Sequence, residues 1–487
     1  MKTPIFDFVQ KYGNSDFSRF HMPGHKGRDF TGSERFDITE IDGADVLYAS
    51  DGIIKESEEN ASSLFCTAKT FYSTEGSSHT IRAMLGAVAT HKKGTRALIL
   101  AARNVHKAFI YACAALDIDV EWIYPQNFTH LCSCIITKAD VERAISDCGE
   151  RKPDAVYITT PDYLGNIADV PAISAVCEHH NILLLADNAH GAYLHFLPDF
   201  CTEKGHPIQH GAHICCDSAH KTLPVLTGGA YLHFSENCPT RYIDAAQKML
   251  RIFATTSPSY LVLQSLDRCN GYLANGFKGN LDKTVKRVLS VKEKIASFGF
   301  IAEETEPLKV VVNIKKAGYC AAEFTEKLAE HKIVPEMCDN DFVVFMASTE
   351  NDERDFERLA EAFASIPLKK PIKDDAQEMN LQHHERKLSI REAVFAPHKT
   401  LPVDEAIGEV CGAPTVSCPP AVPVVISGEV ITEQDAELMK KYNVERCLFG
   451  HLHAHAHAHA PQGNFDGIEC NLVSCDYLDF VPKKIEN

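Results

Sequence analysis

The chain has 487 residues, 45% of them hydrophobic and 24% charged, which is ordinary for a globular protein of about three domains. Its net charge of −17 argues against nucleic acid as the main partner, because phosphate binding needs a basic surface. No apolar run reaches the roughly 18 residues of a membrane span, and the first residues lack the apolar core of a signal peptide. We therefore expect a cytoplasmic protein without a membrane partner, whose 18 cysteines are free thiols.

The first part of the chain predicts an arm followed by a large α/β domain. Residues 1–60 are rich in Gly, Asp and aromatic residues, which favours an extended N-terminal arm. From residue 61, apolar runs alternate with helical patterns, and this predicts a mainly parallel sheet with both faces covered. The expected strands are 96–101, 120–124, 155–160, 182–187, 214–217 and 229–234. The expected helices are 78–91, 104–116, 138–148 and 170–180, the last capped by Asp169.

Two further domains are expected after this large α/β domain of residues 61–275. A smaller α/β domain at 276–368 should contain strands at 309–314 and 342–346 and helices at 321–331 and 352–365. Polar residues 369–390 predict a linker, and 391–487 predict a C-terminal α+β domain. That last domain should contain a strand at 422–426 and a helix at 433–442, for which Thr432 and Asp435 form a variant capping box.

A histidine-rich tract at 451–459 is the one low-complexity segment. Metal binding is one interpretation, because imidazole is a ligand of several transition metals. A solvated loop or an edge strand with its histidines on one face is the other. We favour the second interpretation and predict no metal, since strictly alternating histidines without carboxylate or thiolate partners make an open site.

The strongest chemical signal is Lys221, in a segment that directly follows the apolar strand at 214–217. A lysine at the end of a buried strand can lie in a cleft, where desolvation turns an amine into a usable nucleophile. Taken alone, a surface lysine is the more common outcome at such a position. Two further features of the sequence favour a functional role for Lys221 over a surface position.

Asp187 ends the apolar strand at 182–187, where its carboxylate can cap the next segment or face a cationic ring nitrogen. Gly76, Ser77 and Ser78, here called the cradle, lead into a helix whose N–H groups and dipole can bind phosphate; a plain N-cap is the alternative. The cradle, the carboxylate and Lys221 together fit one cofactor, pyridoxal phosphate (PLP). That cofactor needs a carboxylate to keep its pyridine nitrogen protonated.

These segments resemble the bacterial Orn/Lys/Arg decarboxylases, which are fold-type I PLP enzymes of the aspartate aminotransferase superfamily. The resemblance covers most of the chain and begins at the motif that contains His21, Pro23 and His25. It continues through residues 36–45, 103–107, 187–191, 218–221 and 257–260, and then through 389–393 and 424–431.

The resemblance implies a fold-type I large domain and a role for each candidate residue. Lys221 would hold PLP as a Schiff base, and Asp187 would pair with the pyridine nitrogen. His106 would stack on the cofactor ring; the alternative is an ordinary histidine at a helix N-terminus. His190 and His220 would lie near the ring and the substrate, and Lys221 or His220 would return a proton to the substrate's α-carbon.

The resemblance also implies how the phosphate is held and how the subunits associate. The cradle would bind the phosphate with help from Ser218. Thr256 and Ser257 would reach the phosphate of a neighbouring subunit, so that a homodimer or larger homo-oligomer shares its active sites. The implied activity is decarboxylation of a basic amino acid, arginine slightly favoured over lysine and ornithine. Glu40, Asp42 and Asp45 are candidates for the distal cation, but capping or solvation explains them as well.

Two departures from the family and two alternative functions remain at this stage. The chain begins almost at the His-Met-Pro-Gly-His motif, so it resembles the short form that lacks an N-terminal wing domain. Cys418 stands in a segment that differs from the family's motif, where we favour packing over a pocket role. Another fold-type I reaction, aminotransfer or retro-aldol cleavage, would use the same Lys221 and Asp187. A non-catalytic PLP-binding protein is disfavoured by the presence of both, together with His106.

Overall fold

The computed structural model describes most of the chain as two compact units. Described are residues 1–92, 94–126, 128, 130–197, 205–373, 381, 383–413 and 422–441, with the backbone of 446–449, 463–465 and 468–472. The first unit comprises Met1–Leu381 with Ser417–Val422, and the second comprises Gln382–Val416 with Pro423–Asn487. The histidine-rich tract at 451–459 and Cys418 lie outside the described residues.

A seven-stranded sheet in the order β1-β7-β6-β5-β4-β2-β3 forms the centre of the first unit. Its strands are β1 (Lys69–Ser73), β2 (Leu98–Ala102), β3 (Asp119–Ile123), β4 (Ala155–Thr159), β5 (Leu183–Asp187), β6 (Ile214–Asp217) and β7 (Ala230–Phe234). Strands β2 to β6 pair in parallel, whereas β7 is antiparallel to β6 and to β1. The mainly parallel sheet is confirmed. Strands β2 to β7 lie within two residues of their predicted bounds, whereas no strand was predicted at the position of β1.

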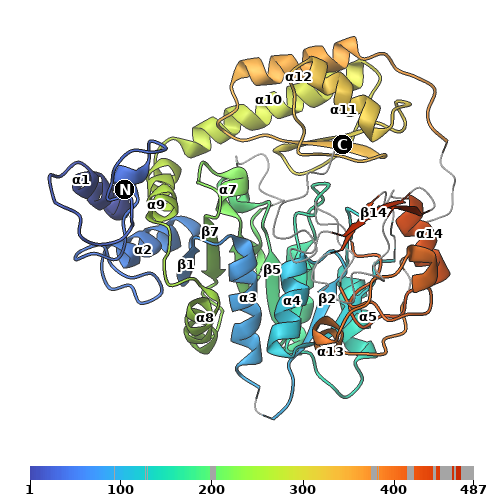
Figure 1. Cartoon of the computed structure of the whole chain (residues 1–487), viewed down its shortest axis with the longest axis horizontal. Helices are drawn as coiled ribbons and strands as arrows, with labels where there is room; N and C mark the ends of the chain where they lie inside the picture. Colours follow the sequence, from blue (N-terminus) through green and yellow to red (C-terminus); the bar gives the residue numbers. More distant parts are fainter. Residues whose placement is uncertain are drawn as a thin grey trace. The chain divides into compact units, whose positions relative to one another are not determined.

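Helices cover the sheet in two groups. Helices α3 (Ser77–Ala89), α4 (Lys107–Leu116) and α8 (Thr240–Phe253) form one, in which α3 packs on both α4 and α8 (Figure 1). Helices α5 (Lys138–Asp147) and α6 (Val170–His180) form the other and pack on each other. Strands β2, β5, β6 and β7 are buried along their whole length, as expected for strands covered on both faces. Asp169 caps α6 as predicted, accepting from the Ala172 amide.

The N-terminal segment differs from the extended arm expected from its composition. It contains α1 (Pro4–Gly13) and α2 (Ile53–Phe65), and α1 packs against α2 and against α9 (Tyr260–Ala274). Helix α1 has only two fully buried apolar side chains, Ile5 and Val9, four residues apart. So short an apolar stripe gives a weak periodic signal, although Pro4 at the first helical position is typical of a helix start.

A four-stranded antiparallel sheet, β10-β11-β9-β8, forms the smaller domain. Its strands are β8 (Ile301–Ala302), β9 (Lys309–Asn313), β10 (Met337–Cys338) and β11 (Phe342–Met346). Figure 1 shows α10 (Phe277–Ser297), α11 (Ala321–Glu330) and α12 (Glu353–Ser365) on one side of this sheet. The shared core includes Val288, Val312, Phe324, Val343 and Phe363. Strands β9 and β11 and helices α11 and α12 confirm the predicted elements, and α10 is a helix that the sequence reading did not identify.

The second unit contains α13 (Ile390–Phe395), α14 (Glu433–Lys441) and a sheet of β12 (Arg446–Phe449), β13 (Gly463–Phe465) and β14 (Ile468–Leu472). The predicted capping box is present, because the Asp435 amide donates to Thr432 Oγ1 and the Thr432 amide donates to Asp435. The strand predicted at 422–426 is wrong. Val422, Val425 and Ile426 are buried, but the Ile426 amide donates to Glu429 at 2.8 Å instead of entering a ladder. None of the helices in the described part of the chain is long and apolar enough to cross a membrane.

Candidate active site

The predicted site residues converge on one edge of the large sheet. Asp187 is the last residue of β5, and Lys221 lies in the short helix α7 (Ala219–Thr222), which follows β6. His106 comes shortly after β2, and Tyr163 shortly after β4. Because β2, β4, β5 and β6 are parallel, their carboxyl ends meet at the same edge, the usual ligand-binding edge of such sheets.

Lys221 and His190 form the closest contact of this edge, with Nζ 3.1 Å from Nε2. Burial lowers the pKa of His190 well below its ordinary value, and the nearby charges of Lys221 and Lys309 lower it further. The imidazole is therefore neutral, and its Nε2 accepts from Lys221 when Nδ1 carries the ring proton. That Nδ1 is buried and has no hydrogen-bond partner among the described residues, so a buried donor is left over at the site.

Asp187 presents a carboxylate held in a fixed orientation. The Tyr157 hydroxyl donates to one oxygen at 3.1 Å, and the Ala189 amide donates to the other at 3.1 Å. The carboxylate is 2% exposed and Tyr157 is fully buried. The Cys216 thiol is a third, weak donor at 3.7 Å. A buried carboxylate needs partners for its charge, and these neutral donors leave capacity for a cationic one.

His106 and His220 are both oriented by the backbone. His106 is the N-cap of α4, where its Nδ1 accepts from the Ala108 amide at 3.1 Å. The ordinary helix-terminus role of His106 is thus present, and it also fixes the plane of the ring. His220 donates from Nδ1 to the Gly229 carbonyl at 3.0 Å, which leaves Nε2 as the basic nitrogen of the neutral ring. Burial lowers the pKa of both histidines.

The cradle lies at the N-terminus of α3, as predicted. Gly76 is the N-cap with φ +74°, a left-handed conformation that favours glycine, and no atom lies within 4 Å of the position that a Cβ would take. Ser77 and Ser78 are the first two helical residues, whose amides have no acceptor within the helix. Ser218, the N-cap of α7, donates to Ser77 Oγ at 2.6 Å and so joins the cradle to the helix that carries Lys221.

The remaining candidates lie outside this group. Thr256 and Ser257 belong to an exposed loop after α8, where the neighbouring Thr255 amide donates to Glu75 at 2.8 Å. Their reach to the phosphate of a second subunit stays a prediction. Asp45 accepts from the amides of Val46, Gly52 and Ile54, so it caps the start of α2. This capping explains its place in the sequence without any substrate.

Tyr163 is a site residue that the sequence reading missed. Its ring lies edge-on to His190, with centroids 5.2 Å apart, and its hydroxyl donates to Glu336 of the smaller domain at 2.7 Å. The position of Tyr163 beyond the end of β4 is the signal that could have identified it, since β4 neighbours the strand that ends at Asp187.

A buried ion pair of the smaller domain, Lys309 with Glu306, holds the backbone at Tyr163. Lys309 Nζ donates to the carbonyls of Asp162 and Tyr163 at 3.0 and 3.1 Å and lies 4.0 Å from Glu306. Glu306 accepts from Tyr193, which follows His190 by three residues. Burial raises the pKa of Glu306 to about 7, although the charge of Lys309 opposes this. The smaller domain therefore holds two chain segments near His190, the one at Asp162–Tyr163 and the one at Tyr193.

Asp217 lies at the centre of a fully buried hydrogen-bonded group next to the site. His206 and His233 each place Nε2 against one carboxylate oxygen, at 2.9 and 3.2 Å, and Asn188 donates to the other at 2.7 Å. The two histidines hold the pKa of Asp217 far below its usual range, against the effect of burial. This group stabilises the end of β6, from which Lys221 extends.

Comparison with known proteins identifies relatives over nearly the whole chain. The family model of the Orn/Lys/Arg decarboxylase major domain matches residues 3–313. An arginine decarboxylase of Bacillus subtilis is 27% identical over 476 residues, covering 90% of this chain and 93% of the relative. Among solved structures, the Francisella novicida lysine decarboxylase LdcF has a TM-score of 0.72 at 18% identity, covering 90% of this chain and 77% of that one. A structure described as SPT with PLP has a TM-score of 0.50 at 14% identity, covering 64% of this chain and 75% of that one.

Proposed function

The chain belongs to the Orn/Lys/Arg decarboxylase family, and from this premise we propose that it uses PLP to remove the α-carboxylate of a basic amino acid as CO2, with arginine as the favoured substrate. The observation that carries the proposal is the convergence of Lys221, Asp187 and the cradle on one sheet edge within the matched residues 3–313. The arginine decarboxylase of Bacillus subtilis supports the choice of substrate.

The residues of this edge fit PLP on observations of the chain itself. The open space at Gly76 and the N-terminal amides of α3 suit a phosphate dianion. The carboxylate of Asp187 suits a protonated pyridine nitrogen. The Nδ1–H of His190, which has no acceptor among the described residues, suits a polar atom of the cofactor. We propose that Lys221 holds the cofactor covalently and that Ser218 assists the cradle.

When bound, PLP supplies an electron sink for the bonds at the substrate's α-carbon. The role of the protein is to orient the cofactor and the substrate and to exclude water from the site. Asp187 keeps the ring nitrogen charged, and the fixed plane of His106 offers a stacking surface. Neutral His190 accepts from Lys221 without adding a competing positive charge near the cationic substrate. The buried Tyr157 hydroxyl keeps the Asp187 carboxylate in one orientation.

Decarboxylation ends with a proton delivered to the α-carbon, and the chain has two groups suited to this step. Lys221 Nζ can carry a proton as an ammonium group. His220 Nε2 is the second candidate, because its Nδ1 is committed to the Gly229 carbonyl. With its pKa lowered by burial, His220 takes up a proton only weakly at neutral pH, so we assign the proton to Lys221.

We further propose that two copies of the chain share their sites, with Thr256 and Ser257 of one copy reaching the phosphate of the other. Their exposure on a loop beside the cradle is compatible with this arrangement. Size-exclusion chromatography with light scattering would test it. A monomer that is fully active at nanomolar concentrations would contradict shared sites.

The substrate is tested by measuring CO2 release from arginine, lysine and ornithine with the PLP-loaded protein. We expect arginine to have the highest kcat/KM and agmatine to be the product. A higher value for lysine or ornithine would overturn the choice of substrate and leave the reaction type intact. Formation of a keto acid without CO2 would instead show aminotransfer. Bound PLP with no turnover of any of the three would show a non-catalytic PLP-binding protein.

A further inference from the structure

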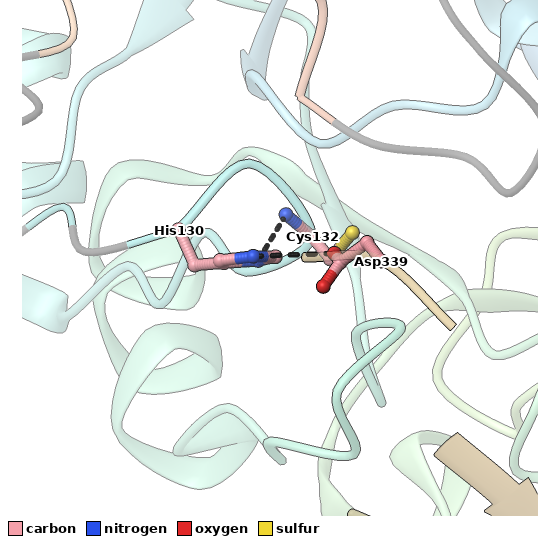
Figure 2. Close-up of side chains that lie close together, drawn as sticks. All are labelled: His130, Cys132 and Asp339. Carbon is pink, nitrogen blue, oxygen red and sulfur yellow. Dashed lines mark hydrogen bonds and ion pairs between the residues drawn. The ribbon is translucent and has the colours of Figure 1, made fainter. Parts of the chain in front are cut away.

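A second cluster of reactive side chains lies away from Lys221, between the large and the small domain. His130 and Cys132 belong to the segment between β3 and α5, and Asp339 and Asp341 lie between β10 and β11. Figure 2 shows the His130 ring pointing toward Cys132 and Asp339. No step of the proposed reaction uses these four residues.

The distances within this cluster are those of ligands around one ion. His130 Nε2 lies 3.3 Å from an oxygen of Asp339 and 3.4 Å from an oxygen of Asp341. The ligand atoms of His130, Cys132 and Asp339 all lie within 4.8 Å of one another. His130 is 4% exposed, and its Nε2 has no partner of hydrogen-bond geometry among the described residues. The two carboxylates therefore face this nitrogen at ion-pair distance, without the alignment of a hydrogen bond.

The separation of His130 Nε2 from Asp339 matches two ligands of a tetrahedral zinc ion. With Zn–N and Zn–O bonds of about 2.0–2.1 Å, two such ligands of a tetrahedron lie about 3.3–3.4 Å apart. One imidazole, one thiolate and carboxylate oxygens are ligand types that Zn²⁺ accepts. We propose that His130, Cys132 and Asp339 form a site for one divalent metal ion of the zinc type, which joins the large domain to the small domain. Asp341 lies beside this site, and its other oxygen pairs with Lys315 at 2.9 Å.

Binding requires two proton shifts, one from Cys132 to solvent and one within the His130 ring. The Cys132 thiol loses its proton to solvent and becomes the thiolate ligand. The proton of the His130 ring moves to Nδ1 when Nε2 binds the metal. Nδ1 now accepts from the Cys132 amide at 3.1 Å, so this hydrogen bond opens and the turn at 130–132 adjusts as the metal enters.

The other histidine cluster in the described part of the chain does not share these features. Asp217 there is paired by His206, His233 and Asn188 at hydrogen-bond distances, and each of these three residues is fully buried. Nε2 of His206 and of His233 each have a hydrogen-bond partner there, whereas Nε2 of His130 has only its two longer ion-pair contacts. Asp339 also keeps some solvent exposure, which gives an ion a route into the proposed site.

The position of the site gives it a definite effect. Ser133, next to Cys132, donates to Asp162 at 2.7 Å, and Asp162 precedes Tyr163, whose ring lies against His190. A metal at this junction would hold the small domain in the position from which Glu336 orients Tyr163. Metal loading should therefore raise the melting temperature of the holoenzyme.

The test measures metal binding directly, in a full-length background with one confounder removed. Because the five histidines of the tract at 451–459 can bind metals themselves, they are first replaced by alanine. The PLP-loaded protein is then treated with chelator, dialysed and titrated with ZnCl2 in a calorimeter, while bound zinc is counted by mass spectrometry. We expect one equivalent of zinc and a higher melting temperature. Co²⁺ in its place should give the intense visible absorption of a tetrahedral site with a thiolate ligand.

Matched variants decide whether the bound ion is at this site. Cys132→Ser and Asp339→Asn should each weaken zinc affinity at least tenfold and abolish the rise in melting temperature. Cys134→Ser is the control, because this cysteine is also buried and only two residues away but is not in the cluster. Absence of a zinc equivalent from the parent protein would overturn the proposal. Retention of full affinity in Cys132→Ser and Asp339→Asn would overturn it too, as would an equal loss in Cys134→Ser.

Discussion

Lys221 Nζ lies 3.1 Å from Nε2 of His190, and burial keeps that imidazole neutral. The contact joins the end of β6 to the segment after β5, and Tyr163 and Tyr193 extend it to the small domain. The amine of Lys221 is thus positioned by a group that carries no charge of its own at neutral pH.

Replacing Lys221 with alanine should abolish covalent attachment of PLP and lower CO2 release by more than about 10³-fold, because the amine nucleophile is lost. Borohydride reduction followed by peptide mass spectrometry should find a pyridoxyl group on Lys221 of the wild type and none in the variant. Lys107→Ala is the control, since Lys107 is exposed at the start of α4. A reduced adduct on another lysine of the wild type would refute the assignment.

Asp187→Asn should retain PLP but lower kcat by about 10²-fold or more, because the amide cannot stabilise the charge on the pyridine nitrogen. Tyr157→Phe removes only the 3.1 Å hydrogen bond to this carboxylate and should cost about tenfold or less. Steady-state kinetics with a PLP-content assay measure both. Equal losses in the two variants would mean that orientation of Asp187, and not its charge, matters.

His106 combines a capping role with the proposed stacking role, and two substitutions separate them. His106→Ser keeps a side chain that caps helices well, so we expect near wild-type stability but weaker PLP binding. His106→Phe keeps an aromatic face and loses the cap, so PLP should bind better than in His106→Ser while stability falls by about 1 kcal/mol. Fluorescence titration with PLP and urea unfolding provide the readouts. The reverse ranking of PLP affinities would argue against stacking.

Glu306 should make stability fall as pH rises, because burial raises its pKa from 4.5 to about 7. Between these values the folded state binds a proton that the unfolded state has released, so folding is favoured at the acid end of the window and this contribution disappears by its alkaline end. Glu306→Gln mimics the protonated form, and its stability relative to wild type should increase from pH 5 to pH 8, by at most about 3 kcal/mol.

Urea unfolding at several pH values measures this difference. Glu303→Gln is a suitable control, because Glu303 lies close in sequence but is partly exposed. A constant difference between Glu306→Gln and wild type across the pH range would show that Glu306 is ionised throughout in the folded protein.

The sequence predicts the local part of the site and misses what distant segments add to it. Lys221, Asp187 and the cradle stand directly at strand or helix ends, and continuous apolar runs identify those ends. The sequence does not identify Tyr163 as a site residue, because its position depends on a hydrogen bond to Glu336, more than 170 residues later in the chain. No local pattern indicates that contact. Lys309 and Glu306 read as ordinary surface charges three residues apart, although both are fully buried.

The errors in the fold have a similar cause. The apolar run at 422–426 signals burial, but burial does not distinguish a ladder strand from a turn whose amide binds Glu429. Helix α1 buries Ile5 and Val9 against α2 and α9, so its stability comes from tertiary packing more than from its own pattern. The antiparallel pairing of β1 with β7 joins residues about 160 apart, which periodicity cannot indicate.

That last pairing determines when during synthesis the site can form. The cradle follows β1, but β1 lies at the edge of the sheet and pairs only with β7, which ends at Phe234. A nascent chain that has emerged only as far as Asp187 thus contains the carboxylate proposed to face the ring nitrogen, but neither Lys221 nor a docked cradle. Helix α1 can pack in its final position only later, when α9 at 260–274 has also emerged. We therefore expect PLP to bind late, after more than half of the chain has left the ribosome. Its binding would then stabilise a large domain that is already nearly folded.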